Sequence, residues 1–485
     1  MLRRRFFLAA ATMFLVTAGL AVAPRLARAK EDLPTLRSTR PVVSIRQGSA
    51  LAPDSWRLAP DVKPDVFEAE LPDGKPVRVT FLSDVDSISF QVEEGSRHDF
   101  VIRHGSDRCL TRVVGVRVVP MAVFDEGYQA KHRGTITAEI PEVYELVNIV
   151  LAMTPTGIAD SNLVYQASPY YRDVRAWFDP HRAHSAVAAL DSMLRINRNL
   201  YFNLKMNGYS FELDGNGRIA RSRIYDRTGF PGERRNALLP FLDRLQSFAD
   251  TTRFRAFYER NRSVYDAQIA FYRDSADVKE MLAWLNRNFP KSGGYDSNKI
   301  IFSPLVAYNQ SATWLESGGF RELQAHVNFP YPGDWRRRGG VPLSQAAETV
   351  ARGHIVFTEL NHGYVNPEAD KYADRVLQAI SRRDRWVDPA RGRGYYGGIS
   401  AFNEYMNWGL ANLRVVDIAP MEDQSTLLSL IDDMMTKSRG FPMFAEFSRY
   451  LVGRYRARKP GESIADLYPE IIAWFEARNS SSAAR

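Results

Sequence analysis

The sequence predicts an α+β protein in which an N-terminal β-sandwich precedes a mostly helical domain. From about residue 66 to 138, polar and apolar residues alternate in short runs that turn signals separate. After Pro141 the apolar residues recur with the spacing of amphipathic helices. We therefore expect a β-sandwich-like domain over 30–135, a helical domain over 136–479 and a disordered tail over 480–485.

The first 29 residues have the layout of a signal peptide. Arg3–Arg5 precede the uncharged apolar run Phe6–Ala23, and Ala27-Arg28-Ala29 provides small residues at a cleavage site. The run is barely long enough to cross a bilayer, so an uncleaved anchor is the alternative. We predict cleavage after Ala29, no membrane span in the mature chain, and a periplasmic or secreted bacterial protein. The arginines also resemble a twin-arginine signal, so the export pathway stays open.

Charge and cysteine content narrow the class of protein. The chain has 64 Lys and Arg against 56 Asp and Glu, and five of the basic residues belong to the leader. The mature chain is therefore nearly balanced, and its densest basic spot, Trp335–Arg338, lies in a predicted loop rich in Pro and Gly. We predict no binding of nucleic acid. The single cysteine, Cys109, lies among strand-like residues, which indicates a buried structural thiol.

Short runs with period-two alternation predict the strands of the first domain. They are Val42–Ile45, Val77–Leu82, Ser87–Val92, Asp99–Arg103 and Leu110–Val119.

Helical periodicity dominates the second domain. The predicted helices are 167–178, 183–206, 235–275 with breaks, 276–288, 342–365, 368–382, 399–413, 421–436, 440–457 and 463–478. A hairpin is expected at Tyr209–Leu213, with its turn at Asp214–Gly217. Lys299–Phe302 and Leu323–Asn328 are two further strand candidates.

The segment His354–Pro367 is the most informative part of the chain for chemistry. We predict that it continues a helix and ends at Gly363 or Pro367. Thr358 and His362 are four residues apart and share a face of that helix, and Glu359 points to much the same side. This is the spacing of a His-Glu-x-x-His zinc helix, with Thr358 in place of the first histidine.

The residues alone leave several interpretations of this helix open. Glu-x-x-His is itself a metal-binding spacing, so Glu359 would be a ligand rather than a base. Thr358 would be a weak ligand through its hydroxyl. His354 is disfavoured as a ligand, because eight residues of helix place it about 12 Å from His362. In the last interpretation no metal binds, and Glu359 and His362 form a buried polar pair.

The helix also resembles a known family. Thr358–His362, followed by Gly363–Pro367, resembles the metal-site helix of the exported bacterial family DUF4932, which is grouped with the gluzincin-type zinc metallopeptidases. The likeness covers about residues 135–420 and includes Ala138–Ile149 and the strands that precede the helix. It implies a zincin-like domain in which His362 and Glu404, 42 residues later, hold Zn²⁺ and Glu359 is the general base.

The resemblance implies a metal-dependent hydrolase of peptides or proteins. A metal-bound water would attack the peptide carbonyl, and Glu359 would accept its proton. Tyr396, in the Gly-rich turn before Glu404, is a candidate oxyanion donor to the substrate, although packing of the turn would also explain it. The alternative function is a non-catalytic protein that binds peptides or an envelope component and retains the zincin scaffold.

Overall fold

A computed structural model describes residues 33–47, 50–51, 56–71, 74–229, 235–292, 294–333, 342–392, 395 and 399–480. The predicted signal peptide and residues 481–485 lie outside these residues. The chain divides into two compact units, one up to Val119 and one from Pro120. The division falls before the expected boundary at residue 135, because β10 (Thr135–Glu139) pairs with β13 (Ser297–Ser303) of the second unit.

The first unit consists of two sheets that share one apolar core. One sheet has the order β1 (Thr35–Ser38), β8 (Arg97–His104), β9 (Asp107–Arg117), β5 (Asp65–Leu71). The other has the order β3 (Ala50–Leu51), β2 (Val42–Gln47), β6 (Val77–Leu82), β7 (Ser87–Val92), with β4 (Trp56–Arg57) beside β2. Alternate side chains from both sheets meet in the core, where the rings of Phe81 and Phe100 lie 4.8 Å apart. Cys109 is buried there, as predicted.

A four-stranded sheet lies at the centre of the second unit. Its order is β10, β13, β15 (Phe320–Asn328), β14 (Ser311–Ser317). The first three strands are parallel, and β14 is an antiparallel edge strand. Both strand candidates of the sequence are confirmed as β13 and β15, and the hairpin is confirmed as β11 (Phe211–Leu213) and β12 (Ile219–Arg221).

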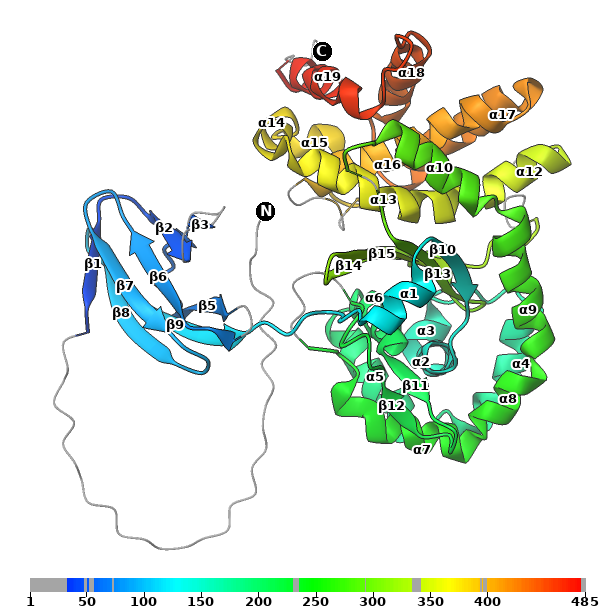
Figure 1. Cartoon of the computed structure of the whole chain (residues 1–485), viewed down its shortest axis with the longest axis horizontal. Coiled ribbons are helices and arrows are strands. Elements are labelled where there is room, and N and C mark those ends of the chain that lie inside the picture. Colours follow the sequence, from blue (N-terminus) through cyan, green and yellow to red (C-terminus); the bar gives the residue numbers. More distant parts are fainter. Residues whose placement is uncertain are drawn as a thin grey trace, which may run out of the picture. The chain divides into compact units, whose positions relative to one another are not determined.

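Helices cover both faces of this sheet (Figure 1). On one side lie α2 (Glu142–Met153), α3 (Pro155–Ala159), α5 (Ser185–Ile196) and α6 (Leu200–Asn207). On the other side lie α10 (Val278–Asn288), α13 (His354–Asp370) and α16 (Ser400–Ile418). The remaining helices are α1 (Glu126–His132), α4 (Pro169–Phe178), α7 (Leu242–Thr252), α8 (Phe254–Arg260), α9 (Arg262–Ala270), α12 (Gln345–Arg352), α14 (Ala373–Ala379), α15 (Arg383–Trp386), α17 (Met421–Asp433), α18 (Phe444–Arg456) and α19 (Tyr468–Ser480).

The helix predicted over 342–365 is broken at Gly353 and ends later than expected. Gly353 separates α12 from α13, and a Cβ there would lie 2.9 Å from the side chain of Met281. The helix does not end at Gly363 or Pro367. Pro367 cannot donate to the carbonyl of Gly363, and the hydroxyl of Tyr295 donates to that carbonyl instead, at 2.7 Å. Because this partner replaces the missing bond, α13 continues to Asp370.

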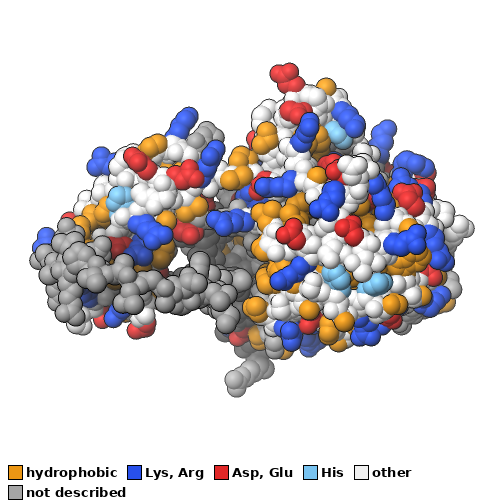
Figure 2. Space-filling view, turned by 90° about the horizontal axis from the view of Figure 1, so that it is seen from below, with side chains coloured by type: hydrophobic (Ala, Val, Ile, Leu, Met, Phe, Trp, Pro, Cys, Tyr) orange, Lys and Arg blue, Asp and Glu red, His pale blue; other side chains and the backbone are white. Residues whose placement is uncertain are grey.

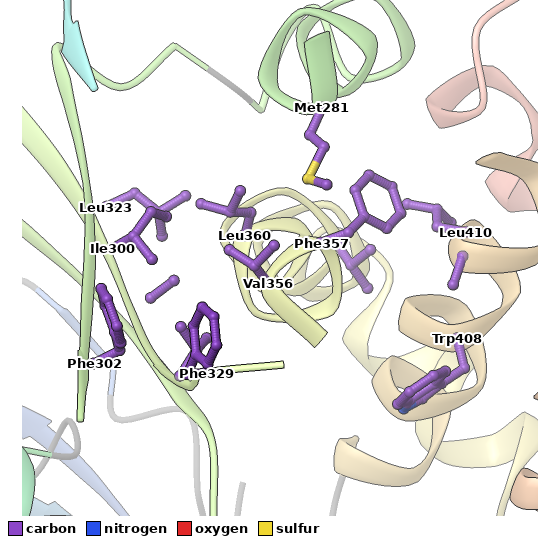
Figure 3. Packing of buried hydrophobic residues seen from close by; sticks show 14 of the residues in the cluster. Met281, Ile300, Phe302, Leu323, Phe329, Val356, Phe357, Leu360, Trp408 and Leu410 are labelled. Carbon is purple, nitrogen blue, oxygen red and sulfur yellow. The ribbon is translucent and has the colours of Figure 1, made fainter. Parts of the chain in front are cut away.

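Packing on two sides fixes the position of α13 (Figure 3). Val356 and Leu360 face Ile300 and Leu323 of the sheet, and Phe357 points toward α16 on the opposite side. All of these side chains are buried. The helix is therefore held between the sheet and α16, and its Asn361 and His362 contact Asn407 of α16.

Two features of the structure concern possible partners: the distribution of charge on the surface, and the length and composition of the helices. Figure 2 shows basic and acidic side chains interspersed over the visible face, with apolar patches between them. Among the helices of the described residues, none has both the length and the apolar composition needed to cross a membrane.

Candidate functional site

The predicted site residues lie in a buried polar layer between α13 and α16. Glu359 and His362 come from α13, and Glu404 comes from α16. Glu359 and Glu404 are buried, and His362 is half-buried. The charges of both His362 and Glu404 act on the Glu359 carboxylate, so the fold brings the three residues into one electrostatic environment.

The hydroxyl of Thr358 is used within its own helix. It donates to the carbonyl of Ile355 at 2.9 Å. The side chain is buried. Its proton is therefore used within the helix, and the hydroxyl would be only a neutral ligand.

Both ring nitrogens of His362 have protein partners. The amide nitrogen of Asn407 lies 2.8 Å from Nδ1 and 3.0 Å from Nε2. The amide oxygen of Asn366 lies 3.3 Å from Nδ1. The Asn407 amide therefore lies against both ring nitrogens of His362. A metal at this imidazole would have to displace that amide.

Glu404 is paired with a cation, Arg439. The guanidinium lies 2.5 Å from the Glu404 carboxylate, and the indole N–H of Trp408 donates to the same oxygen at 3.1 Å. Arg439 also donates to the hydroxyl of Tyr395 at 2.6 Å. Burial lowers the pKa of Arg439, but the neighbouring Glu404 and Tyr395 outweigh burial, so the pKa is raised. Arg439 is therefore charged and neutralises Glu404.

Glu359 lacks such a partner. Its side chain is buried, and within the described residues no hydrogen bond to its carboxylate is formed. Burial raises its pKa, and Glu404 raises it further, whereas His362, Lys205 and Arg439 oppose the shift. Among the described residues, the carboxyl group is therefore able to receive a hydrogen bond from a ligand, as are the amide oxygens of Asn361, Asn403 and Asn407 on the same two helices.

Lys205 approaches this layer from α6. Its ammonium donates to both oxygens of Asn309, with 2.8 Å to the side-chain oxygen. Burial lowers the pKa of Lys205 to about 7, and the charge of Glu359 opposes the shift. No local pattern in the sequence predicts this neighbour, because α6 and α13 are far apart in the chain.

A small cavity adjoins the layer at Trp408. Its volume is about 70 Å³, and Ile355, Tyr331 and Met434 are among its lining residues. His354, the first residue of α13, also lines it. Burial lowers the pKa of His354 to about 3, so its imidazole is neutral, and its Nε2 has no hydrogen-bond partner. Trp408 thus lines the cavity and also donates to Glu404 of the polar layer.

The Gly-rich turn before α16 contributes Tyr395 to the layer. Its ring centroid lies 5.4 Å from the guanidinium of Arg439. Tyr396, the tyrosine singled out by the sequence, lies outside the described residues. Sequence reasoning placed a tyrosine of this turn near the site but selected Tyr396, and it missed Arg439 and Asn407. Asn407 had a usable signal, because it follows Glu404 by three residues on the same helix.

Comparisons with known proteins give no relatives: no family model, no curated protein and no solved structure matches the chain.

Proposed function

We propose that the second unit is a metal-independent peptide-binding protein built on a zincin-like scaffold. The observation that carries the proposal is the pairing of Glu404 with Arg439 at 2.5 Å. The scaffold itself is inferred from the antiparallel edge strand β14, the helix α13 that packs under it, and the second carboxylate supplied by α16. In this proposal the leader delivers the chain to the periplasm or the exterior of a bacterium.

The side chains present do not fit a zinc ion. A zinc site needs ligands with free lone pairs, and a fixed cation beside a ligand opposes a second cation. The Asn407 amide lies against both ring nitrogens of His362, Glu404 is neutralised by Arg439, and the Thr358 hydroxyl is a neutral group that donates within its own helix. Among the described residues, no group of three or more His, Cys, Asp or Glu side chains is placed to hold a metal. Arg439 supplies in this layer the positive charge that a metal would bring.

Three features support a peptide as the ligand. Within the described strands, β14 is paired on one side only, so its other edge has backbone groups that can pair with an extended chain. Glu359 can accept a hydrogen bond or receive an amine from that chain. The cavity of about 70 Å³ beside Trp408 has room for a small apolar side chain.

The proposal is tested by measuring metal content and peptide binding on the same preparation. Elemental analysis after incubation with Zn²⁺ and dialysis is expected to give far less than one zinc per chain. A pool of synthetic hexapeptides with free N-termini is passed over immobilised protein, and retained peptides are identified and titrated. Glu359→Gln is expected to weaken their binding at least ten-fold. The surface substitution Glu422→Gln is the matched control.

Two outcomes would contradict the proposal. One is equal binding of peptides by the wild type and Glu359→Gln. The other is one zinc per chain that is lost in His362→Ala and in Glu404→Ala, together with cleavage of the peptides. The second outcome would support the metal-dependent hydrolase that the family resemblance implies.

A further inference from the structure

A larger cavity lies at another place in the second unit. Its volume is about 620 Å³, which is within the range of small-molecule sites. It is lined by the C-terminal half of α10, by the end of α16 near Asp417, and by the end of α18 with the loop 457–463 that follows it. None of the residues of the polar layer between α13 and α16 lines it. The cavity is therefore a separate candidate site.

Positive charge dominates the lining of this cavity. Arg287, Arg456, Arg458 and Lys459 line it, against the two carboxylates of Asp417 and Glu462. Glu462 lies 3.0 Å from the guanidinium of Arg454, which is outside the lining and is shared with Glu470 at 2.7 Å. The charge of the lining therefore favours an anion.

Two of the cations are available to a ligand. Arg287 is paired with Glu280 at 2.6 Å, and the guanidinium of Arg458 stacks on Tyr455 at 3.6 Å. Arg456 and Lys459 are exposed, and in the described part of the chain neither has an ion-pair partner within 4 Å. Basic residues at the end of a helix also complement its dipole. Lys459 lies beyond the end of α18, however, so the dipole does not account for its position on the cavity.

Uncharged and acidic polar groups line the rest of the cavity. The indole N–H of Trp284 donates to the carboxylate of Asp417 at 2.7 Å, and the hydroxyl of Tyr455 donates to the same oxygen. The second oxygen of Asp417 stays an acceptor. Asn288 and Ser463 also line the cavity, and their side chains are hydrogen-bonded to Arg458 and to Asp466. A carboxylate oxygen such as that of Asp417 accepts from a sugar hydroxyl and repels a second anion.

We propose that this cavity binds a sugar that carries an anionic group, either a phosphate or a carboxylate. Arg456 and Lys459 bind the anionic group. The carboxylate of Asp417 accepts hydrogen bonds from hydroxyls of the sugar ring. A bare anion satisfies only the first half of the site, and a neutral sugar only the second half. The proposal is independent of the peptide-binding function, because the two sites share no residue.

Isothermal titration of the full chain tests this proposal with four probes at low ionic strength: glucose 1-phosphate, glucuronate, glucose and inorganic phosphate. We expect at least one of the two anionic sugars to bind ten-fold or more tightly than both glucose and inorganic phosphate. The double variant Arg456→Gln, Lys459→Gln is expected to lose at least ten-fold in that affinity. The matched control Lys279→Gln, Arg449→Gln removes the same charge from exposed positions outside the cavity and is expected to change the affinity less than two-fold.

Three results would overturn the proposal. They are the absence of binding by both anionic sugars, equal losses in the cavity variant and the control, and binding of inorganic phosphate as tight as that of the tighter anionic sugar. The last result would reduce the cavity to a general anion site. Because Arg456 and Lys459 are exposed, the melting temperature of the double variant is expected to match that of the control, which excludes misfolding as the cause of a loss.

Discussion

The guanidinium of Arg439 lies 2.5 Å from the carboxylate of Glu404 and thereby supplies the positive charge of the layer between α13 and α16. The pair is enclosed by aromatic rings, because Arg439 also lies 5.2 Å from the ring centroid of Trp408. In such surroundings the loss of one partner is more costly than the loss of both, since a lone buried charge has no compensation.

Substitution of Arg439 is therefore expected to destabilise the second unit. Arg439→Gln leaves the Glu404 carboxylate buried without its cation. We expect a loss of about 3 kcal/mol in the free energy of unfolding, the lower end of the range for such pairs, because the Arg439 side chain is 26% exposed. Urea denaturation at pH 7 measures this loss. The double variant Arg439→Gln, Glu404→Gln is expected to recover most of it, and equal losses in the single and double variants would contradict the coupling.

The same pair predicts how zinc binding could be gained. Thr358→His restores the His-Glu-x-x-His spacing, and Arg439→Met releases Glu404 as a ligand. We expect the double variant to retain about one zinc per chain in elemental analysis after dialysis, because two imidazoles and a freed carboxylate together can displace the Asn407 amide from His362. Each single variant is expected to retain little. Zinc retention by the wild type equal to that of the double variant would contradict this account of the layer.

The sequence predicted those parts of the fold that local patterns determine. The strands β13 and β15 and the hairpin after α6 have clear alternation or turn signals. The edge strand β14 was missed, because its polar residues give it little pattern of its own, and pairing with β15 defines it. The end of α13 was misplaced for a similar reason, since the hydroxyl of Tyr295, from a distant loop, allows the helix to pass Pro367.

Only those relationships of the candidate site that lie within one helix could be predicted from the sequence. The spacing of Glu359 and His362 places them together on one helix, and a resemblance suggested Glu404. The partners that decide the chemistry come from other segments. Arg439 lies in the turn after a short π-helical segment, Met434–Ser438, and Lys205 comes from α6 across the sheet. No local pattern carries this information, because ion pairs between distant segments exist only once the chain has folded.

Buried Glu145 predicts a pH dependence of stability. Burial raises its pKa to about 8, although hydrogen bonds from Ser303 and from Tyr170, the latter at 2.6 Å, oppose the shift. Between the unfolded pKa of about 4.3 and pH 8, the unfolded chain has released this proton and the folded chain has kept it. The contribution of Glu145 to the free energy of unfolding therefore falls as the pH rises through this range, by at most about 1.4 kcal/mol per pH unit.

Glu145→Gln isolates this contribution, because the variant retains the shape of the protonated side chain. Urea denaturation of both proteins at pH 5, 6, 7 and 8 gives the difference in their free energies of unfolding, from which other titrating groups cancel. We expect the variant to gain stability relative to the wild type as the pH rises. A constant difference would show that the Glu145 carboxyl does not hold its proton in this range.

The last prediction concerns Lys299, a buried cation on the face of the sheet that lies away from α13. Its ammonium lies 5.4 to 5.6 Å from the ring centroids of three tyrosines, Tyr128, Tyr209 and Tyr225, and 2.8 Å from the hydroxyl of Tyr209. Glu139, 3.6 Å away, is its ion-pair partner.

Lys299→Met removes these contacts, and cation–π interactions are strongest in such desolvated positions. We expect a loss of about 3 kcal/mol in the free energy of unfolding by urea. Lys279→Met, at an exposed position, is the control and is expected to stay within about 0.5 kcal/mol of the wild type. Equal stabilities of the two variants would mean that the three rings do not stabilise the ammonium.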